Sequence, residues 1–227
     1  MSTPKFVFLM DPQQMAPAAG NQWADWANVV AALIVAGATV YGLSSWKREH
    51  RSKRSMELAE TILCAGYECL DAIAAMRVGW LPAWETERVK QHDDESDEDY
   101  RHRRAYEVTF ERYREHSEKF AKLLSLRFRA EVLFSEEHRL AIEKVQRLAN
   151  QVTNAAQDAF RLSSTLRRDP GLAQRLPDTY QNLLAKQHAA EDVLWGLISD
   201  NDTMKPEIDA ARRDLERLFK RLAADGE

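Results

Sequence analysis

The sequence predicts an all-α protein in which an N-terminal transmembrane helix continues into an up-down helical bundle. Three observations support this class. Residues 26–46 contain no charged side chain, apolar residues recur at spacings of three and four through most of the remaining chain, and breakers are scarce, with 8 glycines and 7 prolines in 227 residues. A charged fraction of 30% with so few breakers favours long helices over sheets. The residues beyond 46 are enough for one domain with a hydrophobic core.

The uncharged stretch has the length of a bilayer. From Trp26 to Trp46 there are 21 residues, which span about 31 Å as a helix and match the hydrocarbon thickness of a membrane. Trp23 and Trp26 lie at its start and Tyr41 and Trp46 near its end, where aromatic rings prefer the headgroup level. We therefore predict a transmembrane helix at residues 23–46. A buried helix or hairpin of a soluble protein is the alternative, because the run is only modestly apolar.

The flanking charges predict the orientation of this helix. Only one base precedes it, whereas five bases and one acid follow within eight residues; the bases are Lys47, Arg48, Arg51, Lys53 and Arg54. Because positive charge stays on the cytoplasmic side, we expect a short extracytoplasmic tail at residues 1–22 and a cytosolic bundle at 47–227. A cleaved signal peptide would carry its bases before the apolar run, so cleavage is not expected.

The basic cluster is open to two further interpretations. It can contact anionic lipid headgroups, or it can bind nucleic acid. Nucleic-acid binding is the weaker interpretation, because the cluster has no interleaved aromatic residues and the chain as a whole has a net charge of −4. Orientation of the span together with lipid contact accounts for the cluster, and no nucleic-acid partner is expected.

Small residues mark one face of the predicted span. Ala27 and Ala31 form one pair at a spacing of four, and Ala38 and Gly42 form another. Such pairs let two helices approach closely and support self-association in a bilayer. The alternative is that they merely reflect how common alanine and glycine are in membrane spans.

Beyond the span, apolar stripes predict a series of helices. The first covers residues 55–78, the second 100–134, the third 136–168, and two more begin near Pro177 and Pro206. Ser135 offers an N-cap between the second and third helices, although one kinked rod is the alternative there. The predicted inward residues of the first helix are Leu58, Ile62, Cys69, Leu70, Ile73 and Met76, and Cys64 is also expected to be buried with Cys69. The second helix contributes Tyr106, Phe110, Tyr113, Phe120, Leu123, Leu124 and Phe128, and the third contributes Leu140, Val145, Leu148, Val152, Ala155, Ala159 and Leu162.

An acidic loop is predicted at residues 79–99. Gly79 and Pro82 break the helical pattern, and six acids follow within residues 93–99. The run lacks the ligand spacing of a calcium loop, so we interpret it as a solvated tip whose acids favour the start of the next helix. Trp80 and Trp84 are candidate partner contacts, or they pack on the end of the bundle. The final helix offers a second candidate contact surface through Ile208, Leu215, Leu218 and Phe219.

The sequence contains no motif that defines a chemistry. None of the six histidines belongs to an H-E-x-x-H zinc pair, an E-x-x-H di-iron set or the arginine–histidine pair of helical HEPN nucleases, and there is no phosphate loop or nucleophile elbow. His92 and Asp93 form an isolated dipeptide without the further ligands that a metal phosphohydrolase needs. We therefore expect no catalytic residue, no metal and no cofactor, and no small-molecule substrate is indicated.

The order of several segments resembles small bacterial membrane proteins of unassigned function. The segments are WADWANVVAALIVAGATVYG, KRSMELAETIL, YECLDAIAAM and RYREHSEKFAKLLSLRFRAEVLF, which lie within residues 23–160. Such proteins have one Trp-flanked N-terminal span and a helical cytosolic domain. The resemblance implies a location in the bacterial inner membrane and supplies no catalytic residue.

These observations favour a binding or scaffold protein held at the cytoplasmic face of the membrane. Its partners would be the lipid bilayer and either another protein or further copies of the chain. The alternative is a membrane effector or sensor, for example in a stress or anti-phage response, that acts through oligomerisation in the bilayer.

Overall fold

The computed structural model describes residues 22–196 and 202–224. All regular elements in these ranges are helices, and no strand occurs among them, so the all-α prediction is confirmed. The elements are α1 (Gln22–Met76), α2 (Ala83–Thr86), α3 (Asp97–Glu115), α4 (Ser117–Ser125), α5 (Arg127–Leu133), α6 (Glu136–Arg168), α7 (Leu172–Arg175), α8 (Pro177–Trp195), α9 (Lys205–Leu215), the π-helix η3 (Glu216–Lys220) and α10 (Arg221–Ala224). The chain divides into two compact units, Met1–His50 and Arg51–Glu227, and α1 contributes to both.

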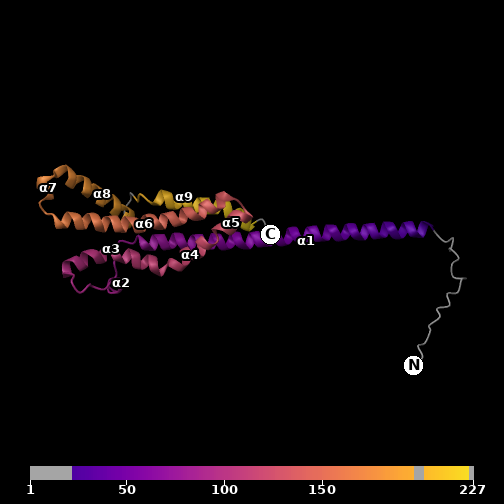
Figure 1. The fold of residues 1–227 in the computed structure, drawn as a ribbon, viewed down its shortest axis with the longest axis horizontal. Helices are drawn as coiled ribbons and strands as arrows, with labels where there is room; N and C mark the ends of the chain where they lie inside the picture. The colour runs from indigo at the N-terminus through magenta and orange to yellow at the C-terminus, as the bar shows by residue number, and fades with distance from the viewer. Residues whose placement is uncertain (1–21, 197–201, 225–227) are drawn as a thin grey trace, which may run out of the picture. The chain divides into compact units, whose positions relative to one another are not determined.

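The second unit is an up-down bundle arranged around α6 (Figure 1). The chain runs along the end of α1, returns through α3, α4 and α5, runs back along α6, and returns again through α8 and α9. It reverses direction in the segment that contains α2, at Ser135 and at α7. Helix α6 packs against α3, α4, α5, α8 and α9, and it therefore forms the centre of the bundle.

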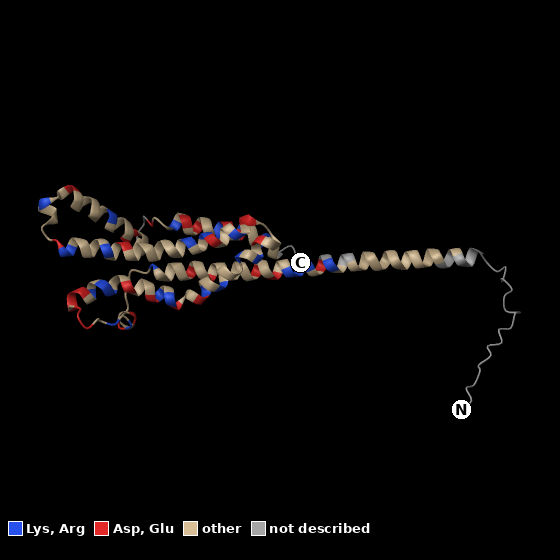
Figure 2. Ribbon diagram, viewed as in Figure 1, with Lys and Arg blue, Asp and Glu red and all other residues tan. Residues whose placement is uncertain are grey.

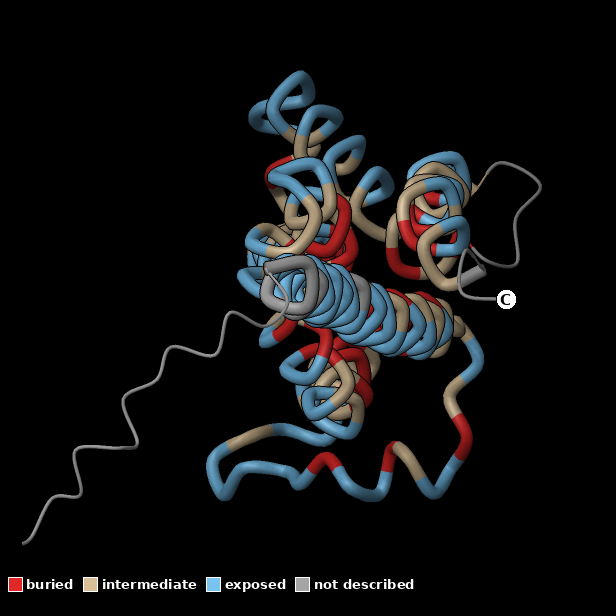
Figure 3. The backbone as a smooth tube through the Cα atoms, turned by 90° about the vertical axis from the view of Figure 1, so that its right-hand side faces the viewer, coloured by how far each residue is buried: buried red, intermediate tan, exposed pale blue. Residues whose placement is uncertain are grey.

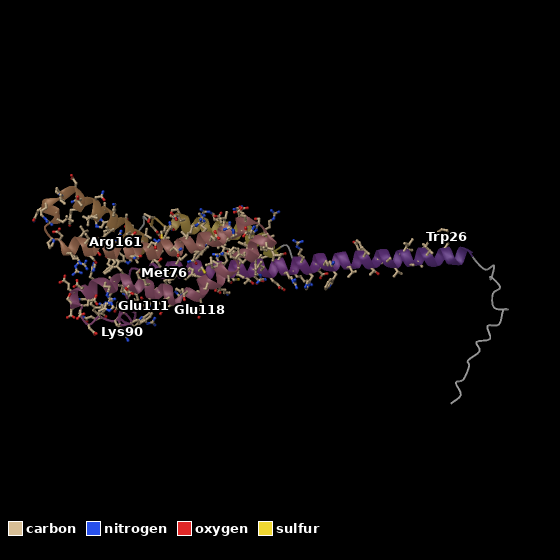
Figure 4. All side chains as sticks on the ribbon, in the orientation of Figure 1. Trp26, Met76, Lys90, Glu111, Glu118 and Arg161 are labelled. Atoms are coloured by element: carbon tan, nitrogen blue, oxygen red, sulfur yellow. The ribbon has the colours of Figure 1, made fainter. Side chains whose placement is uncertain are left out.

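The core follows the predicted stripes of α1 and α6. All six inward residues predicted for the first helix are buried, and Met76 lies among the side chains that fill the bundle (Figure 4). On α6, Val145, Leu148, Val152, Ala155 and Ala159 are buried as predicted. The buried positions face inward along the bundle helices, and the exposed ones lie outside (Figure 3). Gly66 permits a close approach to α9, because a Cβ at this position would lie 2.7 Å from Cδ1 of Leu215.

The structure divides the predicted helix at residues 100–134 into three helices, so the prediction of one continuous helix is wrong. Two tightened turns divide it, at which His116 N–H donates to the Tyr113 carbonyl at 3.2 Å and Leu126 N–H donates to the Leu123 carbonyl at 3.1 Å. These i→i−3 hydrogen bonds narrow the helix locally. The buried positions Phe120, Leu123 and Leu126 accordingly recur at every third residue.

The ends of the other helices follow their local sequence. The side chain of Ser96 accepts from Asp99 N–H at 3.1 Å, and Asp97, Glu98 and Asp99 occupy the first turn of α3, where the helix dipole favours acids. Helices α5 and α6 are separate, so the predicted turn at Ser135 is confirmed, although its hydroxyl pairs with Nδ1 of His138 rather than with a backbone amide. Pro177 and Pro206 lie in the first turns of α8 and α9, as expected.

Three residues predicted to be inside the bundle are exposed. Cys64 is exposed while Cys69 is buried, because five residues correspond to a rotation of about 140° around a helix. Leu140 is also exposed and lies five residues before the buried Val145, which gives the same rotation. Phe128 is 59% exposed, since the two tightened turns shift the face of α5 relative to that of α3.

Candidate functional site

An apolar surface encircles the helix of the first unit. Every residue from Val29 to Leu43 is exposed, and the ribbon carries no charged residue there (Figure 2). The consecutive residues Leu33, Ile34 and Val35 are 67%, 66% and 65% exposed. Because consecutive residues lie about 100° apart around a helix, these three side chains point in three different directions. The apolar character is therefore not confined to one face.

In the ranges that the structure describes, no helix has both the length and the apolarity needed to cross a membrane. The predicted interface residues Trp26, Tyr41 and Trp46 are all exposed, and the Trp46 ring stacks on His50 with centroids 5.4 Å apart. Residues 1–21 and the side chains of Trp23, Ala27 and Arg48 lie outside the described part of the chain. The transmembrane helix therefore stays a prediction.

The remaining members of the small-residue face, Ala31, Ala38 and Gly42, are exposed. A Cβ added at Gly37 or Gly42 would meet no atom within 4 Å. This face is therefore open in the described part of a single chain, and its self-association stays a prediction. Of the basic cluster, Lys47, Arg51, Lys53 and Arg54 are exposed, as residues that contact headgroups would have to be.

Trp80 and Trp84 lie on the surface, at 69% and 55% exposed, so neither indole is enclosed by the bundle. A buried arginine fixes the segment that carries them. Arg112 of α3 donates to the carbonyls of Val78 at 2.6 Å and Trp80 at 3.0 Å, and its guanidinium binds Glu85 at 2.5 Å. The guanidinium of Arg88 lies 4.9 Å from the ring centre of Trp84. The two indoles are thus held on a fixed backbone and face solvent.

The acidic segment 79–99 makes more contacts with the bundle than the sequence predicts for a solvated tip. Thr86 and Val89 are buried, and the Tyr100 hydroxyl donates to the Val89 carbonyl at 2.8 Å. Arg103 donates to the Lys90 carbonyl at 2.8 Å and pairs with Glu95 at 2.8 Å. The hydrogen bond from Arg103 lowers the pKa of Glu95 to about 2. Part of the predicted loop is therefore attached to α3 by hydrogen bonds and ion pairs.

A hollow of about 690 Å³ lies between this segment and the end of α6. His102 Nε2 lies 2.8 Å from the hydroxyl of Ser163, which in turn donates to the Phe160 carbonyl at 3.0 Å. Burial lowers the pKa of His102, which favours the neutral imidazole. Because the Ser163 hydroxyl donates to the Phe160 carbonyl, it accepts the hydrogen bond from Nε2–H of His102. A nucleophile would instead donate its hydrogen bond to the imidazole, so this contact has the direction of a structural hydrogen bond.

The charges around this hollow do not select one ligand. Arg103 is paired with Glu95, and Arg167 with Glu98 at 2.8 Å, so cations and anions neutralise each other along its rim. The described residues contain no group of three His, Cys, Asp or Glu side chains that could hold a metal ion. Among the residues described around this hollow, the His102–Ser163 contact is structural and no set of metal ligands is formed.

The prediction that the final helix offers a surface for partner contact is wrong. Leu215 and Phe219 are fully buried, and Ile208 and Leu218 pack against the core. The wide turn of η3 places Leu215 and Phe219, four residues apart, in the interior. Leu215 and Phe219 hold α9 and η3 to the bundle and are not available to a partner.

A second buried arginine was missed by sequence reasoning. Arg77 is 0% exposed and binds Asp202 through two hydrogen bonds of 3.0 and 2.5 Å, while its Nε donates to the Val193 carbonyl at 2.7 Å. The available signal was its position, because Arg77 follows Ile73 by four residues and thus lies on the apolar stripe. This ion pair joins the end of α1 to the chain between α8 and α9.

Comparisons with protein-family models, with curated proteins and with solved structures each found no match.

Proposed function

We propose that the chain is a single-pass membrane protein whose helical bundle serves as a binding or scaffold module at the cytoplasmic face. Residues 26–46 would cross the bilayer with the N-terminus outside. The observation that carries this proposal is the apolar surface around residues 29–43, which is exposed in every direction. The resemblance of the sequence to small bacterial membrane proteins favours the inner membrane of a bacterium.

The free energy of transferring the exposed aliphatic side chains out of water favours a lipid environment for this helix. Seven large aliphatic side chains between residues 29 and 43 are at least half exposed: Val29, Val30, Leu33, Ile34, Val35, Val40 and Leu43. Transfer of such side chains from water to an apolar environment is worth about 1.5–3 kcal/mol each, or on the order of 10–20 kcal/mol together. A helix that leaves this surface in water gives up that stabilisation, whereas a bilayer provides it.

Two charges in the centre of the helix test the span. We expect the double variant Ile34→Arg and Ala38→Arg to lose membrane association, because each arginine at this depth costs about 2.5–3.5 kcal/mol. The matched control is the double variant Asn154→Arg and Gln157→Arg, which adds the same charge at exposed positions of α6. Vesicle flotation of the full chain measures the effect. Co-flotation of the first variant to the same extent as the wild type would contradict the proposed span.

The exposed tryptophans are the proposed protein-contact site of the module. Arg112 and Glu85 hold their segment in one conformation, which lowers the entropy lost when a partner binds. Indole side chains are enriched at interface hot spots. The double variant Trp80→Ala and Trp84→Ala should lose partners in a detergent pull-down, while Leu176→Ala, also exposed, should keep them. An unchanged set of partners would remove this segment from consideration.

A second candidate function is an effector or sensor that oligomerises in the bilayer. The open space beside Gly37 and Gly42 favours it, since a second helix can approach there without a clash. The double variant Ala38→Leu and Gly42→Leu should lower the cross-linked oligomer in vesicles, and the double variant Val30→Leu and Val40→Leu is the control that introduces two leucines outside the small-residue pairs. An unchanged oligomer size in the first variant would count against this function.

A further inference from the structure

Two large apolar side chains lie on the outer face of α5. Phe128 and Val132 are 59% and 82% exposed, and Val132 is more exposed than any large apolar residue described in 26–46. They are four residues apart and therefore share one face of the helix. Single exposed apolar residues are common on proteins, but an adjacent pair on a short helix places apolar surface in water with no gain in folding.

Cationic side chains surround this pair. The guanidinium of Arg127 lies 4.6 Å from the ring centre of Phe128, and Arg129 is exposed between the two apolar residues. Arg129 and Arg54 line one hollow of about 440 Å³, together with Glu57, Leu58, Thr61 and Leu133. Helix α5 and the first residues of the second unit thus form a common surface at the end of the bundle opposite α7 (Figure 1).

A second hollow that contains arginines lies on the C-terminal helices, where Arg217 is paired with Glu137 and Arg221 has no ion pair among the described residues. Arg217 and Arg221 line this hollow of about 450 Å³, with Phe134, Leu218 and Leu222. Phe134 follows α5 directly, so the two hollows adjoin through this helix. Both combine arginines with apolar walls, which is the side-chain composition that suits a headgroup layer.

Three acids near this surface are held by other partners, and Glu57 leaves the first hollow with two arginines against one acid. Arg139 binds Glu131 at 3.3 Å and Glu136 at 2.9 Å, and Arg217 binds Glu137 at 2.8 Å. These carboxylates are therefore neutralised within the bundle. The arginines of α5 are left to act outward.

We propose that the α5 face, defined as Arg54, Arg127, Phe128, Arg129 and Val132, rests on the headgroups of an anionic bilayer. This inference rests on the proposed membrane span. Arginine matches the phosphate groups of lipids, and a phenylalanine and a valine beside it can enter the boundary of the acyl chains. The bundle would then contact the same membrane that anchors it.

The chain length allows this contact. Arg54 lies eight positions after Trp46, the end of the predicted span, and both belong to the uninterrupted helix α1. Eight helical residues cover about 12 Å, which is comparable with the headgroup layer of about 5–8 Å on each side of the hydrocarbon core plus one arginine side chain. Arg54 and the α5 residues that share its hollow thus come within reach of lipid phosphates.

Lipid-borne quenchers test the contact in the full chain. In a background of Cys64→Ser and Cys69→Ala, a fluorophore is attached to Val132→Cys, and the chain is reconstituted in phosphatidylcholine vesicles with or without phosphatidylglycerol. The matched control is Thr165→Cys, an exposed position near the opposite end of α6, and Val35→Cys reports on the span itself. We expect spin-labelled lipids to quench the probe at 132 in vesicles that contain phosphatidylglycerol, and not the probe at 165.

Neutralising two arginines separates charge from simple proximity. Each base near an anionic surface is worth about 1 kcal/mol, so Arg127→Gln with Arg129→Gln should shift the contact equilibrium by about 30-fold towards the detached state. Quenching at 35 without quenching at 132 would overturn the α5 contact and leave the span intact, whereas quenching at neither position would overturn both. Quenching at 132 that ignores phosphatidylglycerol or the two arginines would overturn the anionic-lipid proposal. Protection of 132 that rises with protein density, without lipid quenching, would identify a second copy as the occupant instead.

Discussion

Replacement of Arg77 by methionine is expected to destabilise the bundle strongly. Methionine keeps the length and much of the volume of the side chain but removes its charge and all of its donors. The change leaves the Asp202 carboxylate, whose pKa is held below its usual range chiefly by the hydrogen bond from Arg77, without its partner. The Val193 carbonyl loses its donor as well.

The expected loss follows from the burial of the pair. The Arg77 side chain is 0% exposed and that of Asp202 is 10% exposed, and removal of one partner from a buried ion pair costs about 3–5 kcal/mol. A domain of this size has a total stability of about 5–15 kcal/mol. The single substitution should therefore remove a large fraction of the stability of the bundle.

Urea unfolding of the full chain in one mild detergent, followed by circular dichroism, measures this loss. The matched control is Arg161→Met, because the Arg161–Asp158 pair is exposed and should contribute less than about 1 kcal/mol. The added substitution Asp202→Asn removes the orphaned charge and keeps an oxygen for the amides of Met204 and Lys205, so it should recover part of the loss. A loss for Arg77→Met no larger than that of the control would refute the role of this ion pair.

Three further predictions concern thiols, acid and the acidic segment. The native chain should react with a thiol reagent at Cys64 only, because burial raises the pKa of Cys69 to about 12. The thiol of Cys69 should react as well once urea unfolds the chain. Two reactive thiols in the native chain would be inconsistent with this packing. Arg103 lowers the pKa of Glu95 to about 2, so the stabilising effect of the Glu95–Arg103 pair is present above pH 4–5 and is lost as the pH falls towards about 2. Glu95→Gln should flatten the acid-unfolding curve in this window. An unchanged slope would speak against the ion pair. Arg112→Gln should speed limited proteolysis between residues 79 and 99 while the helices elsewhere stay resistant, and an unchanged cleavage rate would show that the segment is held by other contacts.

The periodicity of the sequence predicted most of the cores of α1 and α6, with the exceptions of Cys64 and Leu140. These helices are long and uninterrupted, so that one face extrapolates reliably from its first residues to its last. The same reasoning failed at Phe128 because two tightened turns, at His116 and Leu126, change the register of the helix. Neither turn contains glycine or proline, and the sequence therefore gives no local sign of them.

The candidate surfaces were predicted less completely, since they depend on contacts between distant segments. The sequence offered Trp80 and Trp84 either as partner contacts or as residues packed on the bundle end, and the buried Arg112 that fixes their backbone lies 32 residues beyond Trp80. The Arg77–Asp202 pair joins residues 125 positions apart. The α5 face requires both the register of the helix and its proximity to Arg54, which only the assembled bundle provides.

Behaviour of the purified full-length chain without detergent tests the central claim most directly. If residues 26–46 cross a bilayer, the chain should aggregate when detergent is removed and should instead float with lipid when vesicles are supplied. A chain that stays monomeric and monodisperse in plain buffer, and stays behind when vesicles float, would contradict the membrane anchor.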